Sequence, residues 1–476
     1  MIAFSAILLK LAAVMGLRRL LELCLLGFTL NACAYWRIGR PLDAVQVHAP
    51  DGWMAASTGA NASISNGWLA GFNDPVMTRL VDEALVHNQD LMAVAAAMRE
   101  AGQSTLLTRA RQRPTLDLGG GGTLVDSPDF TSSSRQYGLN LAASWELDVW
   151  GRLRELTAAA QANEQAAVED YRGARLSLAA NTAKAWCNLL SAGQELALAK
   201  VTLDSFEKNL RIIERNYRGT GEGALDIQFG RTNVSSARRA VESRKVERDE
   251  AARSLELLLG RYPGGMMRDD AELPKLPDKI PAGLPAELLD RRPDLAAARA
   301  RLFASARLAD ASRKSLLPSF SITAAGNAAS PRLSDLLDWQ KLTGSVAGTF
   351  AQTISSGGAL SAEARASLIR NERLLHGYAQ AALNAFREVE AALAADRSLA
   401  KQESFLSDEM AQAVLAERQA ERDYAEGINP NILSVLEAQR RANNARAGMI
   451  RLRNERLQNR IDLHLALGGD FHTIKK

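Results

Sequence analysis

The chain contains an internal repeat, and this feature constrains its fold more than any other. Glu214–Tyr217 read Glu-Arg-Asn-Tyr, and about 208 residues later Glu421–Tyr424 read Glu-Arg-Asp-Tyr. In both places a Gly-containing break and a helical pattern follow, and the two patterns end at Gly260 and Gly468. A repeat of this length indicates a duplicated supersecondary unit, so we expect a fold with internal pseudo-symmetry.

The repeat extends upstream of these passages. Asp90-Leu91 and Asp294-Leu295 each precede an Ala-rich run that ends at a proline, Pro114 or Pro318. Each proline opens a short alternating segment, a second such segment follows, and a Gly then starts a very long helical stretch. Each half is therefore predicted as helix, strand, strand, long helix, turn and helix. Residues 261–285 are too Pro-rich for either period and are predicted to join the halves.

The N-terminus has the features of a bacterial lipoprotein signal peptide. Arg18-Arg19 precede a short apolar run that ends at Leu30-Asn31-Ala32-Cys33, and this run is too short to span a membrane. The pattern predicts cleavage before Cys33 and acylation of Cys33, with an ordinary signal peptide and an incidental Cys as the alternative. Met1 and Met15 both remain open as the start.

These features define the expected organisation of the chain. The segments are a signal peptide at 1–32, a lipidated segment at 33–73, the first repeat at 74–260, the linker at 261–285, the second repeat at 286–468 and a tail at 469–476.

The composition argues against several kinds of site. If Cys24 is removed and Cys33 is acylated, Cys187 is the one remaining thiol, so no intramolecular disulfide is expected. The five His are dispersed and no pair has metal-ligand spacing, so we expect no metal, no cofactor and no enzyme. The net charge of +4 comes from scattered Arg residues, and no basic run is dense enough to indicate nucleic-acid binding.

Four segments alternate between apolar and polar residues. The clearest is Tyr137 to Val149, and weaker ones cover 319–324, 345–355 and 115–118, the last running into Gly119 to Gly122. Such alternation places one face in an apolar medium and the other in water. In a barrel, the polar face of the clearest segment would line the lumen. Its lumen-facing candidates are Asn140, Ser144, Glu146 and Asp148.

The number of these segments makes a prediction about assembly. After Cys33 no apolar run reaches the roughly 18 residues of a transmembrane helix, whereas about ten residues suffice for a tilted transmembrane strand. Four strands are too few for a closed barrel, which needs about eight. A bilayer tolerates no open sheet edge, so a membrane protein of this kind requires several chains to share one barrel. The alternative is a soluble sandwich with one buried face.

Two stretches, about 152–218 and 359–426, contain no Pro and keep a helical period throughout. At 1.5 Å per residue each helix would be roughly 100 Å long. In the second stretch, Leu368, Leu375, Ala382 and Val389 recur every seventh residue, which is typical of a coiled-coil seam. A soluble coiled-coil scaffold would fit these helices equally well, and only the alternating strands argue otherwise.

Taken together, the chain resembles the TolC-like outer membrane factor family, in particular its lipoprotein branch in tripartite efflux systems. The resemblance covers nearly the whole mature chain, and the order and spacing of its motifs are specific. The motifs are Trp68 with Phe72-Asn73-Asp74-Pro75, Asn88–Leu91, Trp145–Arg154, Arg291–Leu295, Ala385–Glu390, Val435–Arg440 and Ala466–Gly469.

The resemblance implies an α+β membrane protein that forms a homotrimer. Each chain would give four strands to a twelve-stranded outer-membrane β-barrel, which a periplasmic α-helical coiled-coil tunnel continues. The implied function is the passive outer membrane duct of an efflux pump, anchored to lipid through Cys33. The implied partners are a periplasmic adaptor and an inner-membrane pump, expected to be of the proton-driven RND type. A duct for type I protein secretion and a periplasmic coiled-coil adaptor lipoprotein are the alternatives, and the cargo is not indicated.

The resemblance also implies a gate at the periplasmic tip. The family often has Asp at two places that are Ser434 and Glu437 here, and one carboxylate per protomer would form a repelling, cation-binding ring. Asp226 occupies the matching place in the first repeat, and Asn429 stands where some relatives carry Arg. The alternative for each residue is a surface or packing role at a helix turn. The gate candidates are Asp226, Tyr424, Leu433, Ser434, Glu437 and Arg440.

Overall fold

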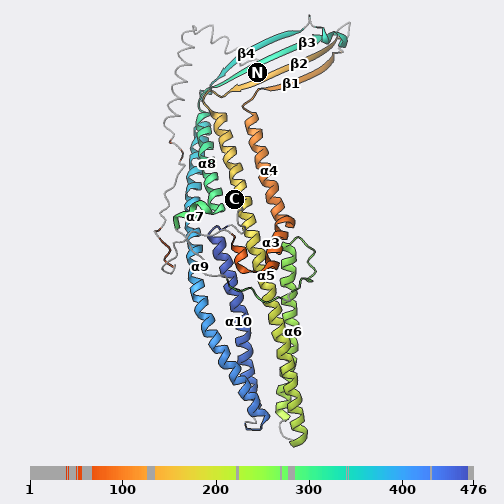
Figure 1. Cartoon of the computed structure of the whole chain (residues 1–476). Coiled ribbons are helices and arrows are strands. Elements are labelled where there is room, and N and C mark those ends of the chain that lie inside the picture. The colour runs from red at the N-terminus through yellow and green to blue at the C-terminus, as the bar shows by residue number, and fades with distance from the viewer. Residues whose placement is uncertain are drawn as a thin grey trace. The chain divides into compact units, whose positions relative to one another are not determined.

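The computed structural model describes residues 39, 41, 50, 52–55, 67–125, 134–220, 224–268, 271–276, 285–338, 340, 342–428 and 431–469. The signal peptide, the lipidation candidate Cys33, Asn429, the loop at 126–133, much of the linker and nearly all of the tail lie outside the described residues. The described part is mostly helical, with one antiparallel sheet (Figure 1). Its elements are η1 (Trp68–Phe72), α3 (Pro75–His87), α4 (Gln89–Ala110), β1 (Thr115–Val125), β2 (Ser134–Leu147), α5 (Arg152–Thr220), α6 (Ala224–Leu258), α7 (Pro285–Arg291), α8 (Pro293–Lys314), β3 (Ser319–Ser330), η2 (Leu333–Leu337), β4 (Thr343–Ala351), α9 (Ala359–Ala425) and α10 (Ile432–Ala466).

The order of elements repeats as the sequence predicts. The series α4, β1, β2, α5, α6 is followed by α8, β3, β4, α9, α10. Paired helices also match in length, with 22 residues in α4 and α8 and 35 residues in α6 and α10. The long helices α5 and α9 have 69 and 67 residues, which confirms the two long helical stretches.

The fold divides into two compact units, and each takes residues from both halves of the sequence. The strand unit includes residues 97–168 and 297–380 and contains the sheet. The helix unit includes residues 48–96, 169–296 and 381–476, and it contains α6, α10 and the parts of α5 and α9 that form the two helical hairpins with them.

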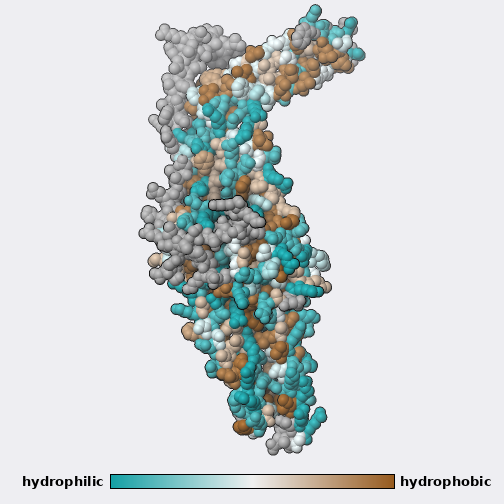
Figure 2. Space-filling view, viewed as in Figure 1, coloured by the Kyte–Doolittle hydropathy of each residue, from teal (hydrophilic) through white to brown (hydrophobic). Residues whose placement is uncertain are grey.

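The sheet of the strand unit has the order β1-β2-β3-β4, with every neighbour antiparallel. Its register places Trp145 beside Ile322 and Phe320 beside Phe350, so apolar residues of neighbouring strands share one face. On the other face Asn140 is beside Asn327, and Glu146 is beside Ser321. The apolar face is largely exposed, and in Figure 2 hydrophobic residues gather over the sheet. Its exposed members include Leu116, Leu118, Leu141, Trp145, Ile322, Val346 and Phe350.

The strand boundaries correct two expectations. The strand expected over 137–149 ends at Leu147, and the segment expected over 345–355 ends at Ala351, so Ile354 lies beyond β4. Conversely, β1 continues through Gly119 to Gly122, where alternation could not be read because glycine has no side chain. At Gly122 a Cβ atom would lie 3.0 Å from the ring of Tyr137, so this glycine leaves room for the aromatic side chain on β2.

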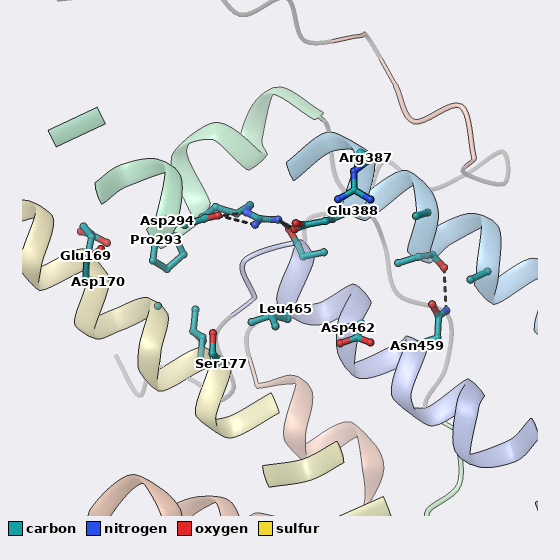
Figure 3. Close-up of a pocket in the computed structure, with 17 residues that line it drawn as sticks. Glu169, Asp170, Ser177, Pro293, Asp294, Arg387, Glu388, Asn459, Asp462 and Leu465 are labelled. Carbon is teal, nitrogen blue, oxygen red and sulfur yellow. Dashed lines mark hydrogen bonds and ion pairs between the residues drawn. The ribbon is translucent and has the colours of Figure 1, made fainter. Parts of the chain in front are cut away.

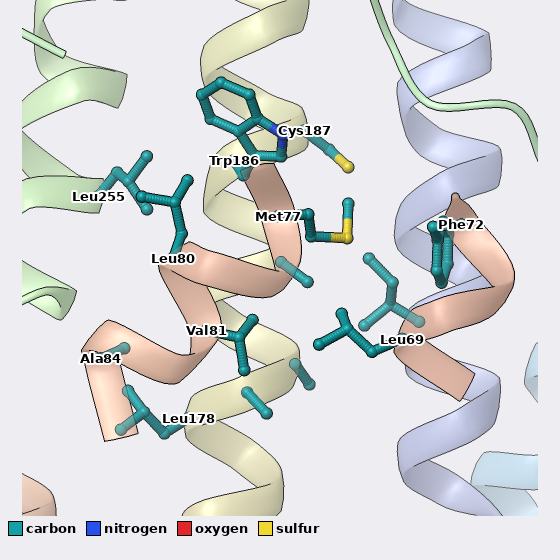
Figure 4. Close-up of a cluster of buried hydrophobic side chains, with 14 of the residues drawn as sticks. Leu69, Phe72, Met77, Leu80, Val81, Ala84, Leu178, Trp186, Cys187 and Leu255 are labelled. Carbon is teal, nitrogen blue, oxygen red and sulfur yellow. The ribbon is translucent and has the colours of Figure 1, made fainter. Parts of the chain in front are cut away.

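The main apolar core of the helix unit lies where α3 packs on α5 (Figure 4). Met77, Val81 and Ala84 of α3 are fully buried and share this core with Leu178 and Cys187 of α5. Burial raises the pKa of the Cys187 thiol to about 12, so the thiol is a packed, unreactive group at neutral pH. None of the described helices has an apolar stretch long enough to cross a membrane.

A capping residue fixes where α3 begins. The carboxylate of Asp74 accepts hydrogen bonds from the backbone N–H groups of Val76 at 2.8 Å and Met77 at 3.0 Å, and Pro75 occupies the first helical position. The second carboxylate oxygen accepts a hydrogen bond of 2.8 Å from the indole N–H of Trp186 on α5. The cap of α3 therefore also joins the two helices.

Part of the expected linker is held firmly on α6 by a buried carboxylate. The oxygens of Glu256 accept hydrogen bonds from the backbone N–H groups of Gly265 and Met266, both at 2.7 Å, and of Met267 at 3.0 Å. The guanidinium of Arg248 donates to the carbonyl oxygen of Met267 at 2.6 Å. Hydrogen bonds thus hold the backbone of residues 265–267 on α6, although the Met266 side chain is exposed.

Candidate functional site

Within the helix unit, ion pairs join the two helices of each hairpin, and they all have the same orientation. Acidic residues lie on the first helix, α5 or α9, and Arg residues lie on the returning helix, α6 or α10. These contacts fix the alignment of two very long antiparallel helices. The pairs are Glu195–Arg244 (2.9 Å), Glu207–Arg238 (2.8 Å) and Glu214–Arg231 (3.4 Å) in the first hairpin, and Asp396–Arg460 (2.7 Å), Glu403–Arg456 and Glu417–Arg446 (2.5 Å) in the second.

Arg238 and Arg446 occupy equivalent positions on α6 and α10, 208 residues apart. Both terminal nitrogens of the Arg446 guanidinium donate to Glu417, at 3.2 and 2.5 Å, and the Glu417 side chain is only 11% exposed. The carboxylate that binds Arg238, that of Glu207, is 33% exposed. Because solvent screens exposed pairs more strongly, the pair in the second hairpin contributes more to holding its helices together.

Gln439 stands at the position equivalent to Arg231, and it is buried. Its amide nitrogen donates to Glu421 on α9 at 2.7 Å and to Ser205 on α5 at 3.3 Å. Gln439 therefore links three helices near the tip. Gln439 belongs to the motif Val435–Arg440, but its role could not be predicted from the sequence, because its burial depends on α5, more than 200 residues away in the chain.

The tip of the second hairpin packs against α5 through a small apolar cluster. Ile432 and Val435 of α10 are buried with Ile213 of α5, and the gate candidate Tyr424 is partly buried against them. The side-chain oxygen of Asn431 accepts a hydrogen bond of 3.0 Å from the backbone N–H of Leu433 and so caps α10. Gly427, with a φ of 73°, ends α9 in the left-handed region.

Glu437 has two cationic partners on its own helix. Its carboxylate accepts both a bidentate pair of hydrogen bonds from Arg440, each 2.8 Å, and one of 2.7 Å from Arg441. Hydrogen bonds from Arg440 and then Arg441 lower the pKa of Glu437 to about 2. The group of three side chains carries a net charge of +1, so within one protomer Glu437 is not the lone carboxylate that a repelling acidic ring would need.

The structure brings three of the six gate candidates together. Leu433, Glu437 and Arg440 of α10 line a groove of about 620 Å³ with Phe206 of α5 and Phe229 of α6. The other three lie elsewhere on the tip. Tyr424 belongs to the apolar cluster, Ser434 is exposed on α10, and Asp226 lies in the first turn of α6, where a negative charge stabilises the helix N-terminus.

Of the four lumen-facing candidates, three lie on β2 and on the polar face of the sheet. Asn140, Ser144 and Glu146 pair with Asn327, Thr323 and Ser321 of β3. Asp148 does not belong to this face, which corrects its assignment as a strand residue. It follows the end of β2, and its carboxylate caps α5 by accepting the backbone N–H groups of Leu153 and Arg154, both at 2.9 Å.

In the second repeat, Arg292 joins the start of α8 to α9 and α10, and we call this group of contacts the joint of the second repeat. It lies beside a cavity of about 720 Å³ in the helix unit (Figure 3). Arg292 donates to Glu388 on α9 at 2.7 Å, to Asp294 at 2.7 and 3.0 Å, and to the carbonyl oxygen of Ala466 on α10 at 3.2 Å. Burial opposes the charged form of Asp294, but the hydrogen bonds from Arg292 prevail and lower the pKa of Asp294. Among the described residues, no three His, Cys, Asp or Glu side chains are placed to hold a metal ion.

The family model described as outer membrane efflux protein matches residues 80–261 and 284–469. The outer membrane protein OprJ of Pseudomonas aeruginosa is 32% identical over 468 residues, which cover 94% of this chain and 95% of OprJ. The cation efflux system protein CusC of Escherichia coli is 30% identical over 409 residues, covering 85% and 88%.

Solved structures give the same result for the fold. The open state of the Neisseria gonorrhoeae MtrE outer membrane channel superposes with a TM-score of 0.79 at 26% identity, over 92% of this chain and 98% of MtrE. The two matched regions of the family model contain both hairpins and all four strands. The chain therefore belongs to the outer membrane efflux protein family.

Proposed function

We propose that this protein is the outer membrane channel of a tripartite efflux pump, a passive duct that is gated at its periplasmic tip. The observation that carries the proposal is the sheet of the strand unit, which exposes one apolar face and keeps its polar side chains on the other. Such a sheet fits a wall with lipid on one side and water on the other.

The edges of the sheet support a shared barrel. In the part of the chain that the structure describes, β1 and β4 each pair with a strand on one side only. Unpaired backbone groups are strongly unfavourable in lipid, and four strands cannot close on themselves. We infer that β1 of one copy pairs with β4 of the next and that three copies form a barrel of twelve strands.

We propose that the hairpin tips form the gate. Asp226, Tyr424, Leu433, Ser434, Glu437 and Arg440 are its candidate residues, and Leu433, Glu437 and Arg440 share the groove with Phe229. The Glu437–Arg440–Arg441 group favours a gate held by ion pairs within each protomer over one that is biased by repulsion between carboxylates. On this view, opening requires α10 to move relative to α5 and α6.

The remaining proposals concern anchoring, partners and cargo. Cys33 would carry the lipid anchor, and a periplasmic adaptor with an inner-membrane pump would supply energy and select cargo. Relatives of nearly equal identity are named for cation efflux, toluene efflux and pyoverdine export. Channels of one architecture thus serve pumps with different substrates, so the cargo of this channel would follow from its pump.

A pair of neighbouring substitutions on β4 tests the channel directly. Val346 lies on the exposed apolar face, and Ser345 lies on the polar face. V346R places a cation in lipid at a cost of about 2–4 kcal/mol and should prevent heat-resistant trimers and insertion into the outer membrane. S345R should insert normally and change the single-channel conductance and ion selectivity in planar bilayers. Recovery of the wild-type chain in the soluble or inner-membrane fraction would refute the proposal, as would equal effects of the two variants.

A further inference from the structure

The N-terminal segment makes a specific contact with α9. The carboxylate oxygens of Glu390 accept hydrogen bonds from the backbone N–H groups of Met54, at 2.7 Å, and Ala55, at 2.8 Å. Trp53 packs edge-on against Phe386, with ring centroids 6.1 Å apart, and both side chains are buried. Phe386 and Glu390 are four residues apart on one helix, so they present a ring and a carboxylate on the same face.

The equivalent positions in the first repeat carry small side chains instead of a ring and a carboxylate. The positions on α5 equivalent to Phe386 and Glu390 are Ala179 and Ala183, each 207 residues earlier. Both alanines are fully buried in the core that α3 covers. In the first repeat, therefore, a helix lies close over small side chains at this place.

The described residues of the second repeat include a shorter helix at the place of α3. At the place of the thirteen-residue α3, the structure describes the seven-residue α7. The residues equivalent to the first turns of α3 are 279–284, which include Pro281 and Gly283 and do not favour a helix. Phe386 and Glu390 thus take the place of the two alanines in the repeat whose described helix is the shorter α7.

We propose that Phe386 and Glu390 form a peptide-binding site on α9, whose ligand is the N-terminal segment at residues 52–55, which turns at Met54 and Ala55. The site recognises an aromatic side chain followed by two successive backbone N–H groups. The carboxylate binds both N–H groups in a charge-assisted, bidentate manner, and the ring excludes water from one side. Docking of this segment buries Phe386 on this face of α9. The motif Ala385–Glu390 thereby has two roles, since Glu388 binds Arg292 at the joint while Phe386 and Glu390 bind the segment.

Hydrogen exchange of the full-length protein, measured by mass spectrometry, tests the site. In the wild-type protein the amides of Met54 and Ala55 should be protected. E390A should raise their exchange rate at least tenfold, W53A should do so as well, and E390Q, which keeps one acceptor oxygen, should give a smaller increase. Chymotrypsin should cleave after Trp53 in E390A and not in the wild-type protein.

E388A is the matched control, because it removes a neighbouring carboxylate that binds Arg292 instead of the segment. It should leave the protection of residues 52–55 unchanged. Amides of the α3 core, such as those of Val81 and Ala84, report whether a variant has lost its fold. The proposal is overturned if residues 52–55 exchange equally in E390A and wild type, or if they lose protection only together with the α3 core. These readouts do not depend on conduction, so they are independent of the channel proposal.

Discussion

Asn88 and Arg292 donate to equivalent carbonyl oxygens in the two repeats. The amide of Asn88 reaches the carbonyl oxygen of Leu258 near the end of α6 at 3.0 Å, and the guanidinium of Arg292 reaches that of Ala466 at the end of α10 at 3.2 Å. Each bond closes its repeat by joining its first and last helices. The second repeat differs because Arg292 also pairs with Glu388 and Asp294.

Replacing Arg292 with the residue of the first repeat should weaken the second joint. R292N can keep a donor for the Ala466 carbonyl, but it leaves Glu388 and Asp294 without this cation. Since both carboxylates are partly exposed, we expect a loss of about 1–2 kcal/mol in the free energy of unfolding, measured by urea titration in detergent. R292K, which keeps the charge without the bidentate geometry, should lie between R292N and wild type. Equal stability of all three proteins would contradict this role for Arg292.

The two hairpins should respond differently when their equivalent ion pairs are broken. R446M leaves the sheltered Glu417 without its bidentate partner, so we expect a loss of about 1–3 kcal/mol and a higher conductance of the closed channel. R238M breaks the more exposed pair with Glu207 and should cost less than about 1 kcal/mol. Thermal melting and single-channel recording of both variants check the order. A larger effect of R238M would show that the first hairpin holds the tip.

Three glycines with similar φ angles allow the cost of backbone strain to be distinguished from the cost of a steric contact with an added Cβ atom. Gly260, Gly468 and Gly427 have φ values of 70°, 66° and 73°. An added Cβ would lie 2.5 Å from the carbonyl oxygen of His87 at Gly260 and 3.1 Å from that of Arg291 at Gly468, with nothing within 4 Å at Gly427. G427A should therefore cost about 1 kcal/mol from backbone strain alone, and the loss should grow in G468A and be largest in G260A. Melting temperatures that do not follow this order would contradict the close approach at the repeat ends.

The contacts of Glu437 should persist in mildly acidic solution. Because its folded pKa is lowered to about 2, these contacts are fully present above the ordinary Glu pKa of about 4.3 and are lost as pH falls through about 2. The difference in closed-channel conductance between wild type and E437Q should hence stay constant from pH 7 to about pH 4. A difference that disappears near pH 4.5 would indicate a carboxylate with an ordinary pKa, as expected for a ring without Arg440 and Arg441.

The elements that depend on local pattern were predictable from the sequence. The absence of Pro and a continuous helical period place α5 and α9 within about two residues of their ends, and alternation places Asn140, Ser144 and Glu146 on one face. The prediction was wrong for Asp148, because alternation continues past the strand into a turn where the carboxylate caps a helix. A periodic pattern cannot show where hydrogen bonding between strands stops.

The contacts that join distant segments were not predictable in the same way. Gln439, Arg292 and Glu390 all stand in motifs that the sequence analysis quoted, yet their partners lie far away in the chain or on another helix. Nothing in the local sequence distinguishes the buried Gln439 from the exposed Arg440 beside it. For Glu437 the local sequence did contain the signal, since Arg440 and Arg441 follow at spacings that favour ion pairs on a helix.

The contact between Ala55 and Glu390 also sets an order of events during folding. The two residues are 335 positions apart, so the N-terminal segment is synthesised long before α9 exists to receive it. Long-range contacts of this kind form late, because a large loop must close first. Until then Trp53 is an exposed aromatic group on an incomplete chain, which is the kind of surface that chaperones bind. Protection of Trp53 would therefore mark the completed protomer, and its appearance could time the last step of maturation.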